Sequence, residues 1–309
     1  MVRIKAYAKI NLTLEIVGEE NGYHRLDSLV GSVDLFDLIT LKKRKDKLSA
    51  VTMKGMGSEQ IPPENNNALK AAEAFSKKYG SGGAQITVYK NIPMGAGLGG
   101  SSADVAGVLL GMAKLYGIDD EKGLAELADT LGSDCRYMLS GGFARMQGRG
   151  NLVTPLDLFS ELYFLAICPQ SDVLTKECYK RYDQMGKPQS RIENATENWI
   201  AALSKNDVNA AGRYLTNDLF APATALNSDV LKAYEEALSF SPLGAVMTGS
   251  GSCVLALFET RELCDWAKSR YKGKFSTYVF RTVKRKDKKL SLKNPFVLSD
   301  EEIESAIEK

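Results

Sequence analysis

A glycine-rich segment, Pro93-Met-Gly-Ala-Gly-Leu-Gly-Gly-Ser-Ser-Ala103, carries the residue types best suited to holding a phosphate group. Its four glycines lack a Cβ, so the backbone can adopt positive φ and bring N–H groups against an anion. Apolar spacing over 105–116 predicts a helix directly after the segment, whose first N–H groups lack partners and whose dipole attracts negative charge. The junction therefore predicts a phosphate site, and the Ser102 hydroxyl is a candidate magnesium ligand. The candidate nucleotide-binding residues of the segment are Pro93, Gly95, Gly97, Leu98, Gly99, Gly100, Ser101, Ser102 and Ala103.

The same glycine spacing occurs in other nucleotide-binding proteins. Gly95-x-Gly97-x-x-Gly100 also matches the dinucleotide-binding fingerprint, which needs an acidic residue about twenty positions on, after a second parallel strand. Asp119 and Asp120 stand near that distance but follow one predicted helix and open another. The sequence contains no G-x-x-x-x-G-K-[ST] loop and neither the H-R-D nor the D-F-G motif of protein kinases. A glycine turn that only permits close packing remains the alternative.

Histidine and cysteine usage limits the other chemistry open to the chain. His24 is the only histidine, so a Ser-His-Asp triad would have to be built around it, and a site with several histidine ligands is impossible. The five cysteines are scattered and include no Cys-x-x-Cys pair, which argues against a disulfide framework or a zinc site and fits a reducing cytoplasm. The chemistry must therefore rest mainly on carboxylates, lysines, hydroxyls and backbone amides.

The composition predicts a soluble, globular protein. Of the 309 residues, 44% are hydrophobic and 25% charged, and 40 basic against 38 acidic side chains leave a net charge of +2. So small a net charge gives no field that would recruit nucleic acid or a membrane. No apolar run is long enough to cross a bilayer, and 1–9 lacks an apolar signal segment.

The predicted strands and helices are mixed along the chain without strict alternation, so the predicted fold class is α+β. A boundary between two parts of the fold is predicted near residue 155. In the first predicted strand, Lys9 and Asn11 share the polar face, opposite the core. The dipeptide Asn21-Gly22 predicts the turn to the next strand. Strands are predicted over 9–16, 26–41, 84–90, 162–168 and 253–258. Helices are predicted over 67–79, 105–116, 121–131, 193–204 and 230–238, and 183–190 is read as a polar connection.

Three segments together resemble the motifs of the GHMP kinases, the superfamily of galactokinase, homoserine kinase, mevalonate kinase and phosphomevalonate kinase. Ala8-Lys-Ile-Asn-Leu12 is similar to the first motif, 93–103 with Asp104 to the second, and Met247-Thr-Gly-Ser-Gly-Ser252 to the third. They follow the family's order, from about residue 5 to about residue 282. Gly22-Tyr-His24 and Gly148-Arg-Gly150 are most similar to the branch that phosphorylates the 2-hydroxyl of a cytidine-diphosphate-linked sugar alcohol, in non-mevalonate isoprenoid synthesis.

The resemblance implies a catalytic pair. Asp134 matches the aspartate that accepts the proton of the substrate hydroxyl. Lys9 matches the lysine beside it, which would hold that carboxylate ionised and polarise the acceptor oxygen or the γ-phosphate. The alternatives are that Asp134 is only the N-cap of a short helix over 135–139 and that Lys9 is an ordinary exposed strand lysine.

The resemblance also implies how the substrates are held. Tyr23 and His24 match a cytosine-binding pair, and Tyr179 is placed to close a second side of the base. The alternative for each of the three is a surface aromatic at the boundary between the domains. Asn66 is expected near the adenine of ATP. The residues expected to contact the acceptor substrate are Asn11, Tyr23, His24, Tyr179, Gly249 and Ser250. The last two belong to a turn that supports the phosphate loop or touches substrate, and a plain turn before a strand is the alternative.

Two features depart from the family pattern. Asp134 is followed by Cys135-Arg136 in place of the usual Val-Pro, which frees the local φ and puts a charge beside the expected base. Arg136 would either help to bind phosphate or indicate another acceptor. The chain beyond Val283 exceeds the family core; its basic run over 284–289 is predicted to be a solvated face and 299–309 a capped helix.

The resemblance implies an N-terminal ATP-binding domain over 1–155, of the ribosomal-protein-S5-domain-2-like type. It implies a C-terminal ferredoxin-like α/β sandwich over 156–309, with a tail from about 284 and the site in the cleft between the domains. The implied cofactors are ATP and Mg²⁺. The implied partner is a small molecule with a cytidine diphosphate moiety, bound by a monomer or homodimer, without nucleic acid or membrane. Two alternatives stay open: a GHMP kinase for another alcohol, such as homoserine or mevalonate, and a non-catalytic nucleotide-binding homologue.

Overall fold

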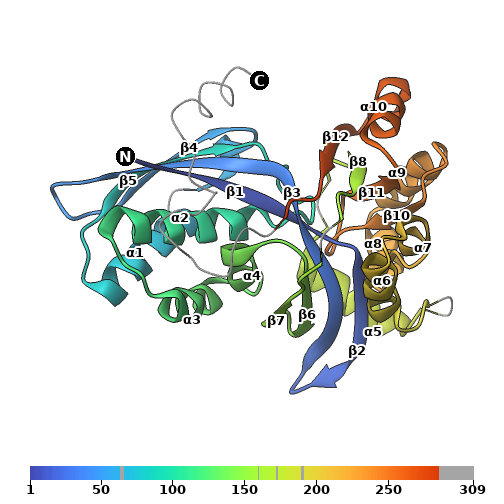
Figure 1. Cartoon of the computed structure of the whole chain (residues 1–309), viewed down its shortest axis with the longest axis horizontal. Coiled ribbons are helices and arrows are strands. Elements are labelled where there is room, and N and C mark those ends of the chain that lie inside the picture. The colour runs from blue at the N-terminus through green and yellow to red at the C-terminus, as the bar shows by residue number, and fades with distance from the viewer. Residues whose placement is uncertain (63–65, 159, 172, 189–190, 285–309) are drawn as a thin grey trace.

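The computed structural model describes residues 1–62, 66–158, 160–171, 173–188 and 191–284. Within these ranges the chain forms two sheets with helices packed on them, a mixed α+β architecture (Figure 1). The strands are β1 (Val2–Asn11), β2 (Thr13–Glu20), β3 (Tyr23–Lys43), β4 (Ala50–Gly55), β5 (Ala84–Lys90), β6 (Ala144–Gly148), β7 (Leu152–Pro155), β8 (Tyr163–Cys168), β9 (Thr216–Asn217), β10 (Gly244–Met247), β11 (Val254–Phe258) and β12 (Ser276–Arg281). The helices are η1 (Ser58–Gln60), α1 (Asn67–Tyr79), α2 (Gly100–Tyr116), α3 (Glu121–Leu131), α4 (Cys135–Ser140), α5 (Thr175–Met185), α6 (Ala195–Ser204), α7 (Val208–Gly212), α8 (Phe220–Leu226), α9 (Ser228–Leu238) and α10 (Arg261–Arg270).

The larger sheet is built around the long strand β3, which pairs antiparallel with β1, β2, β5 and β6. The helix after the glycine-rich segment, α2, packs against β1 and β3. Every residue from Ala103 to Ala113 is buried, as expected of a helix that is apolar on nearly all sides and enclosed by its neighbours. Figure 1 shows α1, α2, α3 and α4 gathered beside this sheet at one end of the molecule. Because α2 is packed against the sheet, its first turn and the loop before it rest on a rigid support.

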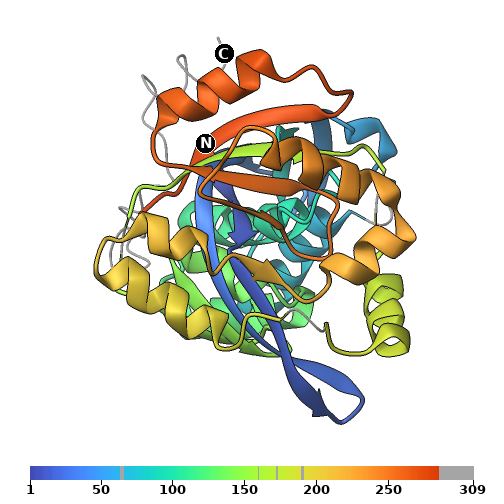
Figure 2. The ribbon, with the colours of Figure 1, turned by 90° about the vertical axis from the view of Figure 1, so that its right-hand side faces the viewer.

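The smaller sheet is antiparallel, in the order β10-β11-β8-β12, and Figure 2 brings it to the front with α10 alongside β12. One face, with Leu165 and Val254, packs in a core with α9 and α10. The other face, with Phe164 and Leu255, belongs to the core of the larger sheet. Because both faces are buried, the strands β8 and β11 consist almost entirely of apolar residues.

Segments after residue 155 complete the larger sheet and its core. Strand β9 pairs in parallel with β2, with Thr13 opposite Thr216. Trp199 of α6 is fully buried in the core of the larger sheet, with its ring centroid 6.4 Å from that of Phe143. The two halves of the chain therefore share buried surface, and a domain boundary at residue 155 stays a prediction.

Most predicted elements have their counterparts, and the first strand differs in an informative way. The structure has α1, α3 and β5 at the predicted bounds and the turn at Asn21-Gly22, where both residues have positive φ. The predicted strand over 9–16 is two strands, β1 and β2, which are separated at Leu12, and β1 begins at Val2. The expectation that its polar face points away from buried surroundings is wrong, because Lys9 is only 6% exposed. The predicted polar connection over 183–190 begins inside α5, a helix that the sequence pattern does not show.

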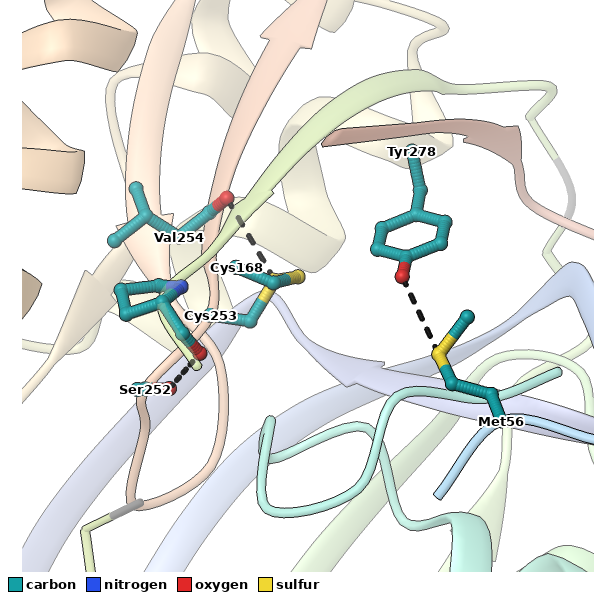
Figure 3. Close-up of a disulfide and its surroundings, with 7 residues drawn as sticks. Met56, Cys168, Ser252, Cys253, Val254 and Tyr278 are labelled. Atoms are coloured by element: carbon teal, nitrogen blue, oxygen red, sulfur yellow. Dashed lines mark hydrogen bonds between the residues drawn. A yellow bond between two sulfur atoms is a disulfide. The ribbon is translucent and has the colours of Figure 1, made fainter. Parts of the chain in front are cut away.

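The prediction drawn from cysteine spacing is wrong for one pair. The sulfur atoms of Cys168 and Cys253 are bonded to each other, as Figure 3 shows. These residues are 85 positions apart, and only the antiparallel pairing of β8 with β11 brings them together. The other three cysteines, Cys135, Cys178 and Cys264, are free and buried.

Two further observations concern the chain as a whole. No helix in the ranges given above combines the length and the apolar character needed to span a membrane. The predicted basic run, except Lys284, and the predicted helix over 299–309 lie outside the described residues.

Candidate active site

The glycine-rich segment forms the loop that connects β5 to α2. Gly95, Gly97 and Gly99 have φ of 65°, 74° and 70°, in the left-handed region that favours glycine. The helix begins at Gly100, and the amide of Ala103 donates to the carbonyl of Gly99 to close its first turn. The loop therefore has the predicted geometry, with backbone bent at alternate residues and a helix N-terminus at its end.

The turn over 248–252 packs against this loop from the other half of the chain. The amide of Ser252 donates to the carbonyl of Gly95 at 3.3 Å, and that of Cys253 donates to Ala96 at 3.4 Å. A Cβ on Gly97 would lie 2.2 Å from the carbonyl oxygen of Thr248, so only glycine fits there. The turn that contains Gly249 and Ser250 is thus in contact with the phosphate loop, the first of its expected roles.

Lys9 of β1 lies at the same loop. Its amide donates to the carbonyl of Leu98 at 3.0 Å, and a Cβ on Gly99 would lie 3.0 Å from its Cγ. Its ammonium group donates to Oδ1 of Asn11 at 2.6 Å and lies 3.4 Å from Oδ2 of Asp134. The lysine and the aspartate, 125 positions apart in the sequence (134 − 9), are therefore an ion pair at the entrance of α2.

Asp134 occupies the N-cap position of α4, but its side chain accepts no capping hydrogen bond. The carboxylate is 27% exposed and lines the large cavity described below. Capping therefore does not account for the carboxylate, which stays available to accept a proton from a bound molecule.

Two cavities meet at the phosphate loop. The larger encloses about 950 Å³ and the smaller about 230 Å³. Both are lined by Gly95, Gly97, Gly99, Gly100 and Ser101, so the loop is a wall common to the two. The other predicted residues that line the larger cavity are Lys9, Asn11, Tyr23, His24, Ser102, Asp134, Tyr179, Gly249 and Ser250. The other predicted residues that line the smaller cavity are Asn66, Pro93 and Leu98, and Ala103 lines neither.

The smaller cavity is partly apolar, with Met53, Ile61 and Ile92 on its wall. Asn66 caps α1, because its Oδ1 accepts hydrogen bonds from the backbone amides of Ala68 and Leu69. The Asn67 amide group donates to the Ser101 hydroxyl at 2.8 Å and ties α1 to the phosphate loop. If the base of a nucleotide were enclosed here, the phosphates of that nucleotide could lie along the loop, which also lines the larger cavity.

A buried charged cluster behind the loop was not predicted. The ammonium of Lys90 donates to the carboxylates of Asp37 and, at 2.7 Å, of Asp104, and all three side chains are buried. Burial raises the pKa of Asp104 to about 8, although the Lys90 ammonium opposes the shift. One sequence signal existed: Asp104 is the only charged residue in the buried run of α2 from Ala103 to Ala113. Its partners could not be identified, because they come from β3 and β5.

The far end of the larger cavity brings an aromatic cluster together. Nε2 of His24 lies 2.7 Å from Oδ1 of Asp183 on α5, and the His24 ring stacks on Tyr179 with centroids 4.9 Å apart. The guanidinium of Arg149 lies 4.5 Å from the centre of the Tyr23 ring. Tyr179 thus faces His24 in this structure. Sequence reasoning assigned no role to Arg149 or Asp183, although both line the cavity.

The residue that departs from the family pattern lies elsewhere. The Arg136 guanidinium makes two hydrogen bonds to the carboxylate of Asp129 on α3, one of them 2.7 Å from Nε. It is not among the residues that line the larger cavity. Its neighbour Cys135 is buried, and burial raises the pKa of that thiol to about 11.

Mg²⁺ requires little from the protein when phosphates supply most of its ligands. It commonly takes one or two protein oxygens beside phosphate and water. The Ser102 hydroxyl lines the same cavity as the phosphate loop, so an oxygen ligand is present. No group of three or more His, Cys, Asp or Glu side chains suited to a metal occurs in the part of the chain that the structure describes. The residues fit a magnesium ion that arrives with a nucleotide.

Comparison with known proteins gives consistent family matches. The model of the family "GHMP kinases N terminal domain" matches residues 66–144, and that of "GHMP kinases C terminal" matches 199–271. The 4-diphosphocytidyl-2-C-methyl-D-erythritol kinase of Carboxydothermus hydrogenoformans is 36% identical over 259 residues, covering 83% of this chain and 88% of that protein. The protein of the same name from Clostridium beijerinckii is 35% identical over 286 residues, covering 89% of this chain and 99% of that protein.

Solved structures show the same likeness. A crystal structure of 4-(cytidine 5'-diphospho)-2C-methyl-D-erythritol kinase superposes with a TM-score of 0.75 at 27% identity, covering 90% of this chain and 98% of that one. Homoserine kinase from Cytophaga hutchinsonii superposes with a TM-score of 0.70 at 21% identity, covering 92% and 95% of the two chains. The second likeness concerns the fold alone.

Proposed function

The chain belongs to the GHMP kinase family, and we propose that it transfers the γ-phosphoryl group of ATP to the 2-hydroxyl of 4-diphosphocytidyl-2-C-methyl-D-erythritol. Relatives with this activity in their names align with most of the chain. The observation that carries the proposal is the wall of glycines common to two cavities, with the Lys9–Asp134 pair on the side of the larger one. The enzyme would act in the cytoplasm, in the non-mevalonate route to isoprenoid precursors.

The nucleotide would occupy the smaller cavity and extend over the loop. The base would lie against Met53 and Ile92, near Asn66, and the phosphates would receive the loop amides and the N-terminus of α2. The Ser102 hydroxyl, on the larger-cavity side, would hold a magnesium ion that accompanies the phosphates. Mg²⁺, when bound, would neutralise charge that develops on the transferring group.

Asp134 would act as the general base. Its carboxylate would accept the proton of the acceptor hydroxyl as the new bond to phosphorus forms, a contribution of about 10²–10⁴ in rate. The Lys9 ammonium, 3.4 Å away, would attract the charge that develops on the phosphoryl oxygens. Asn11, which accepts from Lys9 and donates to the Ser28 hydroxyl, would be fixed at the acceptor end.

The larger cavity would hold the acceptor with its base at the far end. Tyr23, His24 and Tyr179 offer ring faces and one imidazole edge there. Two cationic side chains that line the same cavity, Arg149 and Lys176, would meet the diphosphate. A substrate with a base, two phosphates and a polyol would therefore find matching chemistry along the cavity.

Asp134→Asn tests the chemical assignment. We expect the variant to lose at least about a hundredfold in kcat for the cytidyl substrate, since an amide cannot accept the proton. ATP affinity, measured by calorimetry, should stay within about twofold of the wild type, because Asp134 is not part of the phosphate loop. Asp265→Asn, an exposed aspartate of α10, is the matched control and should leave both quantities unchanged.

Other outcomes identify the alternatives. Turnover of homoserine or mevalonate by the wild type, without turnover of the cytidyl substrate, would assign the chain to another alcohol. A wild type that binds ATP but phosphorylates none of these alcohols would be a non-catalytic homologue. Retained kcat in Asp134→Asn would show that another group takes the proton.

A further inference from the structure

His24 is held in one orientation by residues from the opposite half of the chain. Nε2 lies 2.7 Å from Oδ1 of Asp183, the ring stacks on Tyr179 at an interplanar angle of 29°, and its edge meets Tyr182 at a centroid distance of 5.7 Å. The histidine comes from β3 and its three neighbours come from α5. The plane and the edges of the imidazole are therefore fixed before any base is bound.

The carboxylate decides which ring nitrogen carries the proton. A carboxylate only accepts hydrogen bonds, so Nε2 must donate to Asp183, and in a neutral ring Nδ1 then keeps its lone pair. Within the described residues, the ring of His24 makes no other hydrogen bond, and Nδ1 is not among the buried atoms without a partner. Since His24 lines the larger cavity, Nδ1 remains as an acceptor that a ligand can reach.

An acceptor at this position distinguishes the two common pyrimidines. Cytosine carries an amino group at position 4, which donates, whereas uracil carries a carbonyl oxygen there, which accepts. The lone pair on Nδ1 would pair with the amino group and would face the carbonyl oxygen without a proton between them. We propose that Asp183 is a positioning residue that makes the site select cytosine over uracil by fixing the tautomer of His24. This inference rests on the proposed function insofar as that function places a cytidine diphosphate in the larger cavity.

Substitution of Asp183 gives a result that loss of structure would not give. The amide of Asp183→Asn can present either its oxygen or its amino group to Nε2, so the tautomer of His24 would follow the base that is bound. Discrimination would then fall because the uridine ligand gains affinity. Asp183→Glu keeps a carboxylate and should keep the discrimination. Asp265→Asn, an aspartate of similar exposure on α10, is the control for the charge change.

The readout is the ratio of affinities for CDP and UDP, measured by calorimetry on the full chain without ATP. The wild type should prefer CDP, and Asp183→Asn should lower the ratio by at least about tenfold, mainly through tighter UDP binding. The ratio of kcat/KM for the cytidyl substrate and its uridyl analogue should fall by the same factor, with the KM for ATP unchanged.

Two outcomes overturn the inference. One is a wild type without preference for CDP, and the other is an Asp183→Asn variant that keeps the wild-type ratio, whether its two affinities are unchanged or both fall by the same factor. Failure of the proposed function has a different signature. A wild type that prefers CDP yet does not phosphorylate the cytidyl substrate would contradict the proposed reaction, and the binding ratios of the variants would still decide the role of Asp183.

Discussion

Buried charge is the feature of single residues that most shapes this site. Lys9 is 6% exposed and Asn11 also 6%, on a strand whose neighbours are apolar. A buried ammonium is retained only where partners compensate it, and here Asn11 and Asp134 do so. Side-chain groups held this way cannot reorganise freely, which is the property needed to meet charge that develops during phosphoryl transfer.

The second buried cluster gives a prediction about pH. The pKa of Asp104 is raised to about 8, so the folded protein holds this proton to a higher pH than the unfolded chain does. The stability that the proton contributes is present at low pH and is lost as the pH rises through about 8. For one such group, the free energy of unfolding should fall by about 1 kcal/mol between pH 7 and pH 9.

Asp104→Asn checks this expectation. The amide keeps an oxygen for Lys90 but cannot ionise, so the loss between pH 7 and pH 9 should be smaller than in the wild type by about 1 kcal/mol. Urea unfolding at the two pH values measures it. Equal pH dependence in the variant and the wild type would show that Asp104 is ionised throughout.

At this scale, the motifs grouped residues that the structure also places side by side, while the roles assigned to them stay predictions. Lys9, Asp134 and the loop glycines were placed by their motifs, and the structure brings them together. The partners Asp183 and Lys90 were not found, because each acts through a contact with a distant segment that no local spacing reveals. The disulfide between Cys168 and Cys253 was missed for the same reason.

At the scale of elements, the phosphate loop depends on its contact with the turn over 248–252. Gly97→Ala would place a methyl group 2.2 Å from the carbonyl oxygen of Thr248 and would also strain a backbone with φ of 74°. We expect ATP affinity to fall at least about tenfold, because the loop must move away from the turn. Calorimetry with ATP measures the change.

Gly186→Ala is the control for backbone strain away from the phosphate loop. Gly186 has φ of 75°, but no atom lies within 4 Å of the position that a Cβ would take there, so this variant carries the strain without the clash. It should lose about 1 kcal/mol of stability and keep its ATP affinity. Similar affinities for the two variants would mean that the turn does not support the loop.

Elements with many apolar residues could be predicted, and those that are mostly polar or very short could not. The spacing in α1, α3 and β5 gave their bounds, and glycines marked where α1, α2 and α3 end. Helix α5 is polar along most of its length and buries only Cys178 and Tyr182, so the sequence did not identify it, although it carries Tyr179 and Asp183. Strand β9 has only two residues and is defined by its pairing with β2.

At the scale of the whole molecule, the two halves of the chain are joined by a common core and by the site itself. Residues of the smaller sheet, such as Phe164 and Leu255, belong to the same core as the larger sheet. The cavity likewise takes Lys9 and Asp134 from one half and Tyr179 and Gly249 from the other. Ligands that bind both halves should therefore stabilise the whole chain, and unfolding should not proceed half by half.

The two tryptophans test this coupling. Trp199 follows residue 155 in the chain but is fully buried in the core of the larger sheet. Trp266 on α10 is 50% exposed. Trp199→Ala should lower the free energy of unfolding by about 3–5 kcal/mol, the usual cost of removing a large aromatic side chain from a core. Trp266→Ala should change it by less than about 0.5 kcal/mol. Calorimetry should show one transition, shifted as a whole in Trp199→Ala; two transitions of which only one moves would mean that the halves fold independently and that a boundary near residue 155 is a true domain boundary.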